Sequence, residues 1–198
     1  PAVVREMARG PGAARLAEAV EAYEHGRFRD ARRLLRNLAE RVPGSAAVRE
    51  LHGLTLYQLG RWREAIRELD AFAQLSDSVD QFPVVADCHR ALGHHTVVER
   101  LWDELRRSGT SAEVLVEGRI VVAGDRADRD AVLEGIRLLE EGPVHVRSPR
   151  PHHLRLWYAL AALYEQAGEV PKSRALFRRV FDADPDFADV AARLRGLS

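Results

Sequence analysis

The chain is short of cysteine, lysine and long apolar runs. Its 198 residues contain one cysteine, Cys88, which excludes an internal disulfide framework and leads us to expect a reducing, cytoplasmic environment. No run of about 18 apolar residues occurs, so no membrane span is predicted. Lys172 is the one lysine among 30 cationic residues, a bias that we attribute to GC-rich codons of bacterial type. The chain starts at Pro1, so we expect a processed form or a piece of a longer protein.

Neither sign of charge is in excess, and the motifs of catalysis are missing. Thirty cationic residues balance thirty acidic ones, which leaves no overall field to attract nucleic acid or an anionic membrane. The sequence has no glycine-rich phosphate loop, no G-x-S-x-G, no H-E-x-x-H and no C-x-x-C. We therefore predict no enzyme activity, no catalytic residues, no cofactor and no metal.

Two groups of histidines are the nearest approach to a metal site. They comprise Asp87, Cys88, His89, His94 and His95 in one segment, and His145, His152 and His153 in another. On a helix Cys88 and His89 point about 100° apart, which argues against joint coordination. We favour a small buried Cys88, with histidines that end a helix, and polar loop histidines in the second segment.

A repeat of 34 residues runs through the first part of the chain. The aligned pairs are Gly26 with Gly60, Phe28 with Trp62, Ala31 with Ala65, and Leu35 with Leu69. In each set the glycine ends one helix, the aromatic residue fills the turn, and the alanine lets the next helix approach closely. The pattern predicts helical hairpins.

Two weaker repeats follow. Gly93 lies 33 residues after Gly60, and a second helix containing Trp102 follows it. In the fourth repeat we align Gly118 with Gly53 and place the turn at Gly124 and Asp125. The sequence thus predicts a third and a fourth hairpin, with an extra residue in the fourth turn.

The last repeat, residues 154–185, carries the most complete pattern. It comprises Trp157, Leu160, Ala161 and Tyr164 in the first helix, Gly168 in the turn, Ser173, Phe177 and Val180 in the second helix, and Pro185 as the helix stop. This pattern resembles the tetratricopeptide repeat family, and the resemblance extends over roughly residues 12–185. The chain departs from the family pattern at Glu18, His52 and Pro83.

The resemblance implies an all-α fold, a right-handed α-solenoid of about five hairpins with a C-terminal capping helix. We expect one repeat domain over residues 1–198, with repeats at 12–45, 46–78, 79–110, 111–141 and 154–185. Prolines 143, 149 and 151 predict a loop over 142–153, either a hinge or a binding appendage. Residues 186–198 form the cap, since Phe187, Val190, Ala191 and Leu194 repeat with helical spacing.

Such solenoids bind protein segments in a concave groove lined mainly by the first helix of each hairpin. The resemblance therefore implies a non-catalytic scaffold for a peptide or helix. The groove positions it assigns are Tyr57, Gln58, Asp87, Arg90, Arg119, Arg155, Tyr158, Glu165 and Gln166. Leu16, Val20 and Leu51 stand where some members hold a C-terminal carboxylate, so binding of chaperone tails is disfavoured. Self-association is an alternative use of the same surfaces.

Arginines concentrate in the second helix of the first hairpin. Arg29, Arg33 and Arg36 recur at helical spacing beside Arg32, and three more arginines, Arg174, Arg178 and Arg179, lie in the last hairpin. A solvated outer face is the favoured interpretation, because no aromatic residues are interleaved to stack on bases. A regulatory or nucleic-acid-associated module is the alternative, as is an accessory helical domain of a larger protein.

Overall fold

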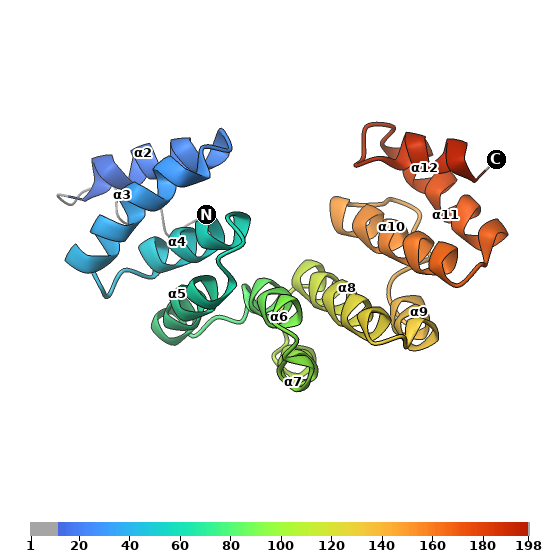
Figure 1. Ribbon diagram of the computed structural model, residues 1–198, viewed down its shortest axis with the longest axis horizontal. Helices are drawn as coiled ribbons and strands as arrows, with labels where there is room; N and C mark the ends of the chain where they lie inside the picture. The colour runs from blue at the N-terminus through green and yellow to red at the C-terminus, as the bar shows by residue number, and fades with distance from the viewer. Residues whose placement is uncertain (1–11, 198) are drawn as a thin grey trace. The chain divides into compact units, whose positions relative to one another are not determined.

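The computed structural model describes residues 12–197, which are helical apart from short connections (Figure 1). The helices within these residues are α2 (Ala13–Glu24), α3 (Phe28–Arg41), α4 (Ala46–Gln58), α5 (Trp62–Ser76), α6 (Phe82–Ala91), α7 (His95–Arg107), α8 (Ala112–Asp128), α9 (Val132–Glu140), α10 (Pro151–Gln166), α11 (Val170–Ala183) and α12 (Val190–Gly196). The predicted all-α class is confirmed. In this part of the chain no helix is both long enough and apolar enough to cross a membrane.

First helices (α2, α4, α6, α8, α10) alternate along the chain with second helices (α3, α5, α7, α9, α11). The chain divides between α6 and α7 into two compact units, which we name unit 1 (to His94) and unit 2 (from His95). In unit 1, α3 packs against both α2 and α4, and α5 packs against α4 and α6. In unit 2, α8 packs against α7, α9 and α10, while α11 packs against α10 and α12.

One backbone conformation makes all five hairpin corners. The corner residue has a positive φ at Gly26, Gly60, Gly93 and Gly168, as the sequence predicts, and also at Asp130. The next N–H donates to the carbonyl five residues earlier; Arg61 N to Leu56 O and Ala131 N to Arg126 O both span 2.9 Å. These bonds satisfy carbonyls that the helix end leaves without partners, and the left-handed residue that permits them is usually glycine.

The fourth corner lies at Asp130, so the predicted turn at Gly124 and Asp125 is wrong. Helix α8 continues through both residues to Asp128. Asp125 is fully buried in the helix, where its carboxylate meets His95 Nδ1 at 2.7 Å and Arg129 at 3.1 Å. These contacts make Asp125 part of the helix interface, and a further turn of helix precedes the corner.

Small residues, except for Val98, flank the corners at fixed distances. The residue seven positions before each corner residue is buried; these residues are Ala19, Gly53, Ala86, Ala123 and Ala161. The residue five positions after each corner residue is also buried; these residues are Ala31, Ala65, Val98, Gly135 and Ser173. Ala123, and not Gly118 as predicted, is therefore the counterpart of Gly53. A Cβ atom on Gly53 would lie 2.5 Å from Leu69 Cγ, and one on Gly135 would lie 2.7 Å from the Ala123 carbonyl oxygen. Close contact between paired helices thus depends on these small side chains.

The proline-rich segment is shorter than predicted. The loop expected over 142–153 ends at Arg150, and α10 begins at Pro151. Proline fits the first helical position because the N–H it lacks would have no partner there. His152 and His153, expected in the loop, are buried in the first turn, where His153 Nδ1 accepts the Arg150 N–H at 2.9 Å.

Residues 142–150, which we name the strap, lie against the last hairpin. The Val144 carbonyl accepts hydrogen bonds from Trp157 Nε1 at 2.9 Å and Arg179 Nη1 at 2.8 Å. Arg179 Nη2 donates to the Val146 carbonyl at 3.2 Å, and the guanidinium lies 3.8 Å from the centre of the Trp157 ring. Both valine side chains pack against the apolar cluster of that hairpin. The strap is therefore a bound part of unit 2.

The C-terminal cap is also shorter than the predicted helix. Helix α12 begins at Val190, because Ala188 has a φ of 48° and interrupts the helical backbone. Phe187, expected within the helix, precedes it and packs against the cluster formed by α10, α11 and α12. Val190 and Leu194 are buried in that cluster, so the cap covers the last hairpin as predicted.

Candidate partner-binding surfaces

In unit 1 the predicted groove residues gather on two neighbouring first helices. The Tyr57 hydroxyl on α4 donates to Asp87 Oδ2 on α6 at 2.7 Å, and Arg90 Nη1 donates to the other carboxylate oxygen at 3.2 Å. Gln58 lies next to Tyr57 and is exposed. Burial, with a smaller effect from Asp87, raises the pKa of Tyr57, so its hydroxyl stays a hydrogen-bond donor.

In unit 2 the corresponding residues connect three helices. Arg155 on α10 pairs with two carboxylates of α8, with Glu113 at 3.1 Å and with Glu117. Tyr158 donates to Asp189, which precedes α12, and burial together with this carboxylate raises its pKa to about 12. These polar contacts run from one first helix to the next and on to the cap.

Glu165 and Gln166 lie at the far end of the same helix. Glu165 pairs with Arg193 of α12 at 2.8 Å, whereas Gln166 is exposed at the end of α10. Among the predicted groove residues, Gln58 and Gln166 have exposed side chains that form no hydrogen bond within residues 12–197. They are the amides best placed to meet a partner.

Arg119 is not joined to the other predicted residues of unit 2. Its side chain is 13% exposed, and Nη1 donates to the Leu138 carbonyl and lies 3.4 Å from Glu141. The guanidinium also stands over the Trp102 ring, 5.3 Å from its centre. Arg119 therefore stabilises the packing of α8 against α7 and α9.

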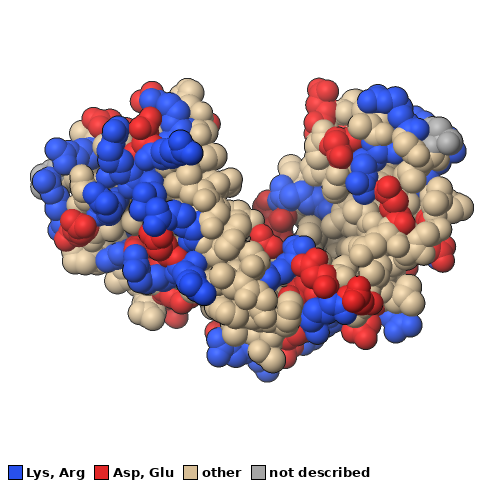
Figure 2. Space-filling model, in the orientation of Figure 1, with Lys and Arg blue, Asp and Glu red and all other residues tan. Residues whose placement is uncertain are grey.

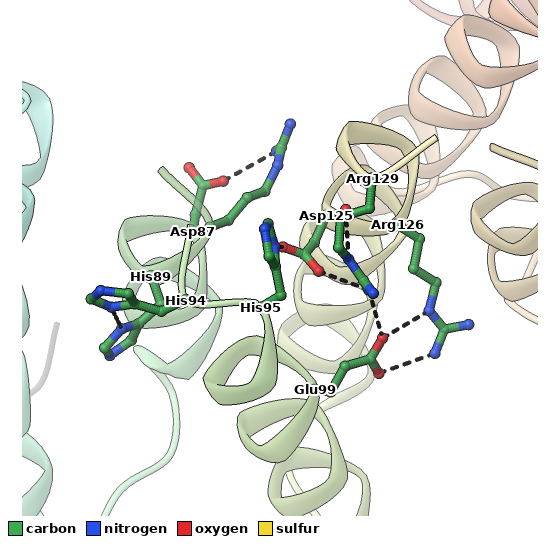
Figure 3. A network of polar contacts seen from close by, with 9 residues as sticks. Asp87, His89, His94, His95, Glu99, Asp125, Arg126 and Arg129 are labelled. Carbon is green, nitrogen blue, oxygen red and sulfur yellow. Dashed lines mark hydrogen bonds and ion pairs between the residues drawn. The ribbon is translucent and has the colours of Figure 1, made fainter. Parts of the chain in front are cut away.

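A second polar network, absent from the sequence predictions, joins α7 to α8 (Figure 3). Arg126 Nε and Nη2 donate to the two oxygens of Glu99 at 3.0 and 3.1 Å, and Arg129 reaches Glu99 at 3.3 Å. The Glu99 carboxylate raises the pKa of Arg126, so the guanidinium stays charged. The sequence carries no signal for these contacts, because the partners are 27 and 30 residues apart.

The histidines considered as metal ligands point to different neighbours (Figure 3). His89 and His94 bring their Nδ1 atoms to 3.0 Å, while His95 faces Asp125. Cys88 is completely buried, and burial raises the pKa of its thiol to about 12. From residue 12 to residue 197, no three histidine, cysteine or acidic side chains are arranged to hold a metal ion.

An arginine-rich face, which we define as Arg29, Arg32, Arg33 and Arg36 of α3 with Arg61 at the start of α5, lies in unit 1. Figure 2 shows cationic side chains gathered over α3 and α5. The four α3 arginines line one surface depression, and Arg29, Arg32, Leu59 and Arg61 line another beside it. The predicted arginine cluster is therefore continued by the corner of the next hairpin.

The last-hairpin arginines behave differently. Arg179 binds the strap, as described, and Arg178 stands 5.8 Å from the centre of the Phe181 ring. Arg174 is exposed on α11. These three side chains form no counterpart of the face on α3.

Comparison with known proteins identifies the repeat type. A family model described as tetratricopeptide repeat matches residues 16–93 and 137–186, more than half of the chain. No curated protein sequence matches the chain. The structure of TTC0263, a thermophilic protein of this repeat type from Thermus thermophilus, is similar with a TM-score of 0.72 at 16% identity, covering 94% of this chain and 98% of that chain.

Two other solved structures share the fold. The apo form of the quorum sensor NprR from B. thuringiensis gives a TM-score of 0.76 at 12% identity, over 94% of this chain and 57% of that chain. YrrB, described as having an unusual peptide-binding site, gives a TM-score of 0.51 at 13% identity, over 99% of this chain and 98% of that chain. At these identities the similarity concerns the fold, which is an α-solenoid of tetratricopeptide repeats.

Proposed function

Because the chain belongs to the tetratricopeptide repeat family, we propose that it is a non-catalytic scaffold that binds a peptide or helix of a partner protein on the faces of its first helices. Tetratricopeptide repeats generally mediate protein interactions, and the stacked first helices of solenoids supply extended binding surfaces. The proposal concerns where on this chain the partner binds.

One observation carries the proposal. In each unit the predicted residues join consecutive first helices: Tyr57 bonds Asp87 in unit 1, and Arg155 pairs with Glu117 in unit 2. Such bonds hold tyrosine rings and charged groups in place before a partner arrives, which lowers the entropy cost of binding. Partly exposed tyrosines with polar neighbours are typical of protein interfaces.

Exposed amides on the same helices as these tyrosines suit a peptide backbone. Gln58 and Gln166 each offer two N–H donors and one carbonyl acceptor. A peptide lying across the first helices can bond to them and pack on Tyr57 or Tyr158. The peptide-binding site described for YrrB, a protein of the same fold, is consistent with this use.

The proposal is tested with a peptide selected from a random library on the intact chain. Its affinity is measured by fluorescence anisotropy for the wild type and for the double variant Gln58→Ala/Gln166→Ala. We expect the double variant to weaken binding about tenfold, since it removes exposed hydrogen-bonding groups at the interface.

Gln74→Ala is the matched control, because Gln74 is an exposed glutamine on the second helix α5. It should leave the affinity of the peptide unchanged. Equal weakening by Gln74→Ala and by the double variant, or no effect of either, would contradict binding on the first helices.

A further inference from the structure

The arginine-rich face of unit 1 has more positive charge than its neighbours neutralise. Of the α3 arginines, Arg29 and Arg36 form no ion pair within residues 12–197. Arg33 meets Asp30 of its own helix at 3.2 Å, with a side chain that is 73% exposed. Arg32 lies 3.9 Å from Glu64, at the limit of an ion pair, and that carboxylate also pairs with Arg61. Exposed pairs of this kind contribute little, so the guanidinium groups remain open to a stronger anionic partner.

The same side chains surround concave surface. Arg29 and Arg32 line both depressions, where α3 meets the Leu59–Arg61 corner of the next hairpin. A depression lined by one sign of charge concentrates the field and selects anions even though the whole chain is neutral. Guanidinium groups bind carboxylates through two parallel hydrogen bonds, which adds geometric selectivity.

We propose that this face binds an acidic segment of a partner protein. The stripe from Arg29 to Arg36 spans seven residues of helix, about 10 Å, which matches three or four residues of an extended peptide. An extended segment with a carboxylate at every second residue presents its charges along one side, at a spacing that the stripe can follow.

An acidic peptide fits the face better than nucleic acid does. The residues that line the two depressions are arginines and Leu59, with no aromatic side chain on which a base could stack. The patch is also short, whereas nucleic-acid binding at physiological salt usually draws on many phosphate contacts. The face lies on the second helix α3, so it provides a site separate from the first helices.

The test uses the intact chain and a fluorescein-labelled peptide of alternating glutamate and serine, with a glutamine–serine peptide of equal length as the uncharged probe. Anisotropy titrations compare the wild type with the triple variant Arg29→Gln/Arg33→Gln/Arg36→Gln. We expect the glutamate peptide to bind, the glutamine peptide not to bind, and the triple variant to lose about tenfold in affinity.

The matched control removes three exposed arginines of unit 2, Arg107→Gln/Arg137→Gln/Arg174→Gln, which changes the net charge by the same amount. This control variant should bind the glutamate peptide with an affinity within about twofold of the wild-type value. Equal losses in both triple variants would overturn the proposal, because they would show that net charge alone governs binding. Absence of binding to the glutamate peptide would overturn it as well.

Two further measurements keep the outcome decisive. A single-stranded oligonucleotide with the same charge as the glutamate peptide is titrated in parallel. If the wild type binds the oligonucleotide more tightly than the peptide, and the triple variant of α3 loses this binding, the ligand of the face is nucleic acid and the proposal is wrong. Circular dichroism verifies folding of each variant. Should the triple variant unfold, the single change Arg36→Glu provides the same comparison, since Arg36 is exposed and forms no ion pair within residues 12–197.

Discussion

At the scale of single residues, a buried charge cluster joins the two helices of the second hairpin. Glu68 on α5 is 4% exposed and receives the Arg49 guanidinium of α4 at 2.6 Å. His52, a departure from the apolar residue usual at its position, is buried 3.5 Å from the same carboxylate oxygen. The His52 imidazole and the Arg49 guanidinium lower the pKa of Glu68 to about 2, against the opposing effect of burial.

We predict that Glu68→Gln destabilises unit 1 by about 3 kcal/mol at pH 7. A carboxylate with a lowered pKa in the folded state contributes stability above its unfolded pKa, near 4.5. This contribution decreases as the pH falls below 4.5 and is lost as the pH falls through 2, because the folded carboxylate is then protonated. Urea unfolding at pH 7 and at pH 2.5 measures the difference in the free energy of unfolding between wild type and variant. This difference should be large at pH 7 and smaller at pH 2.5.

Glu64→Gln is the control for this prediction, since Glu64 lies one turn earlier on α5 and is partly exposed. This substitution should lower the free energy of unfolding by less than about 1 kcal/mol. If the difference in the free energy of unfolding between wild type and Glu68→Gln did not depend on pH, the claim that the fold keeps the Glu68 carboxylate ionised would be wrong.

At the scale of elements, the corner between helices is the structural unit that repeats. Four corners use glycine and the fifth uses Asp130, whose φ of 63° is the same left-handed conformation. A residue with a Cβ atom pays a conformational cost there that glycine does not. Asp130 therefore marks a position where the sequence is not optimal for stability.

We predict that Asp130→Gly stabilises unit 2 by about 1 kcal/mol. Gly168→Ala should have the opposite effect at the next corner, because Gly168 has a φ of 77°. Chemical denaturation of both variants measures the free energies of unfolding. Destabilisation by Asp130→Gly would contradict a corner at this residue, since glycine inside a helix costs about 1 kcal/mol.

The strap provides a second prediction at this scale. Arg179→Ala removes the hydrogen bonds to the Val144 and Val146 carbonyls and the contact with Trp157. We expect trypsin to cleave after Arg147, an exposed strap residue, about tenfold faster in this variant. Mass spectrometry of the fragments over time gives the rate. Arg178→Ala, the neighbouring exposed arginine, should leave it unchanged, and equal acceleration by both would show that Arg179 does not hold the strap.

Prediction from sequence succeeds where a conformation demands one residue type. Four corners are visible because left-handed backbone selects glycine, as at Gly26 and Gly60. The fourth is missed because Asp130 replaces glycine, while Gly124 and Asp125 imitate a turn inside α8. The start of α10 is misplaced because proline, read as a helix breaker, also favours the first helical position.

At the scale of the whole molecule, the repeats supply two kinds of surface. The first helices present tyrosines held by polar bonds, and α3 presents arginines that are largely unneutralised. The overall charge of zero therefore conceals a local excess in unit 1. Under our two proposals, these surfaces bind a peptide or helix and an acidic segment at separate sites.

The candidate site could be predicted from sequence only in part. The repeat period assigns Tyr57, Asp87 and Arg155 to first helices, and the structure places them there. The partner of Arg155, Glu117, lies 38 residues away in the sequence, and the partner of Tyr158, Asp189, lies 31 residues away. No periodicity reveals such pairs. For the same reason the sequence did not show that Arg119 is engaged with α9.

The most direct test of the central claim is hydrogen–deuterium exchange on the intact chain, with and without the library-selected peptide. The account predicts slower amide exchange in the first helices α4, α6, α8 or α10, with second helices α5, α9 and α11 unchanged at short labelling times. Protection confined to the second helices would contradict a partner bound on the first-helix faces.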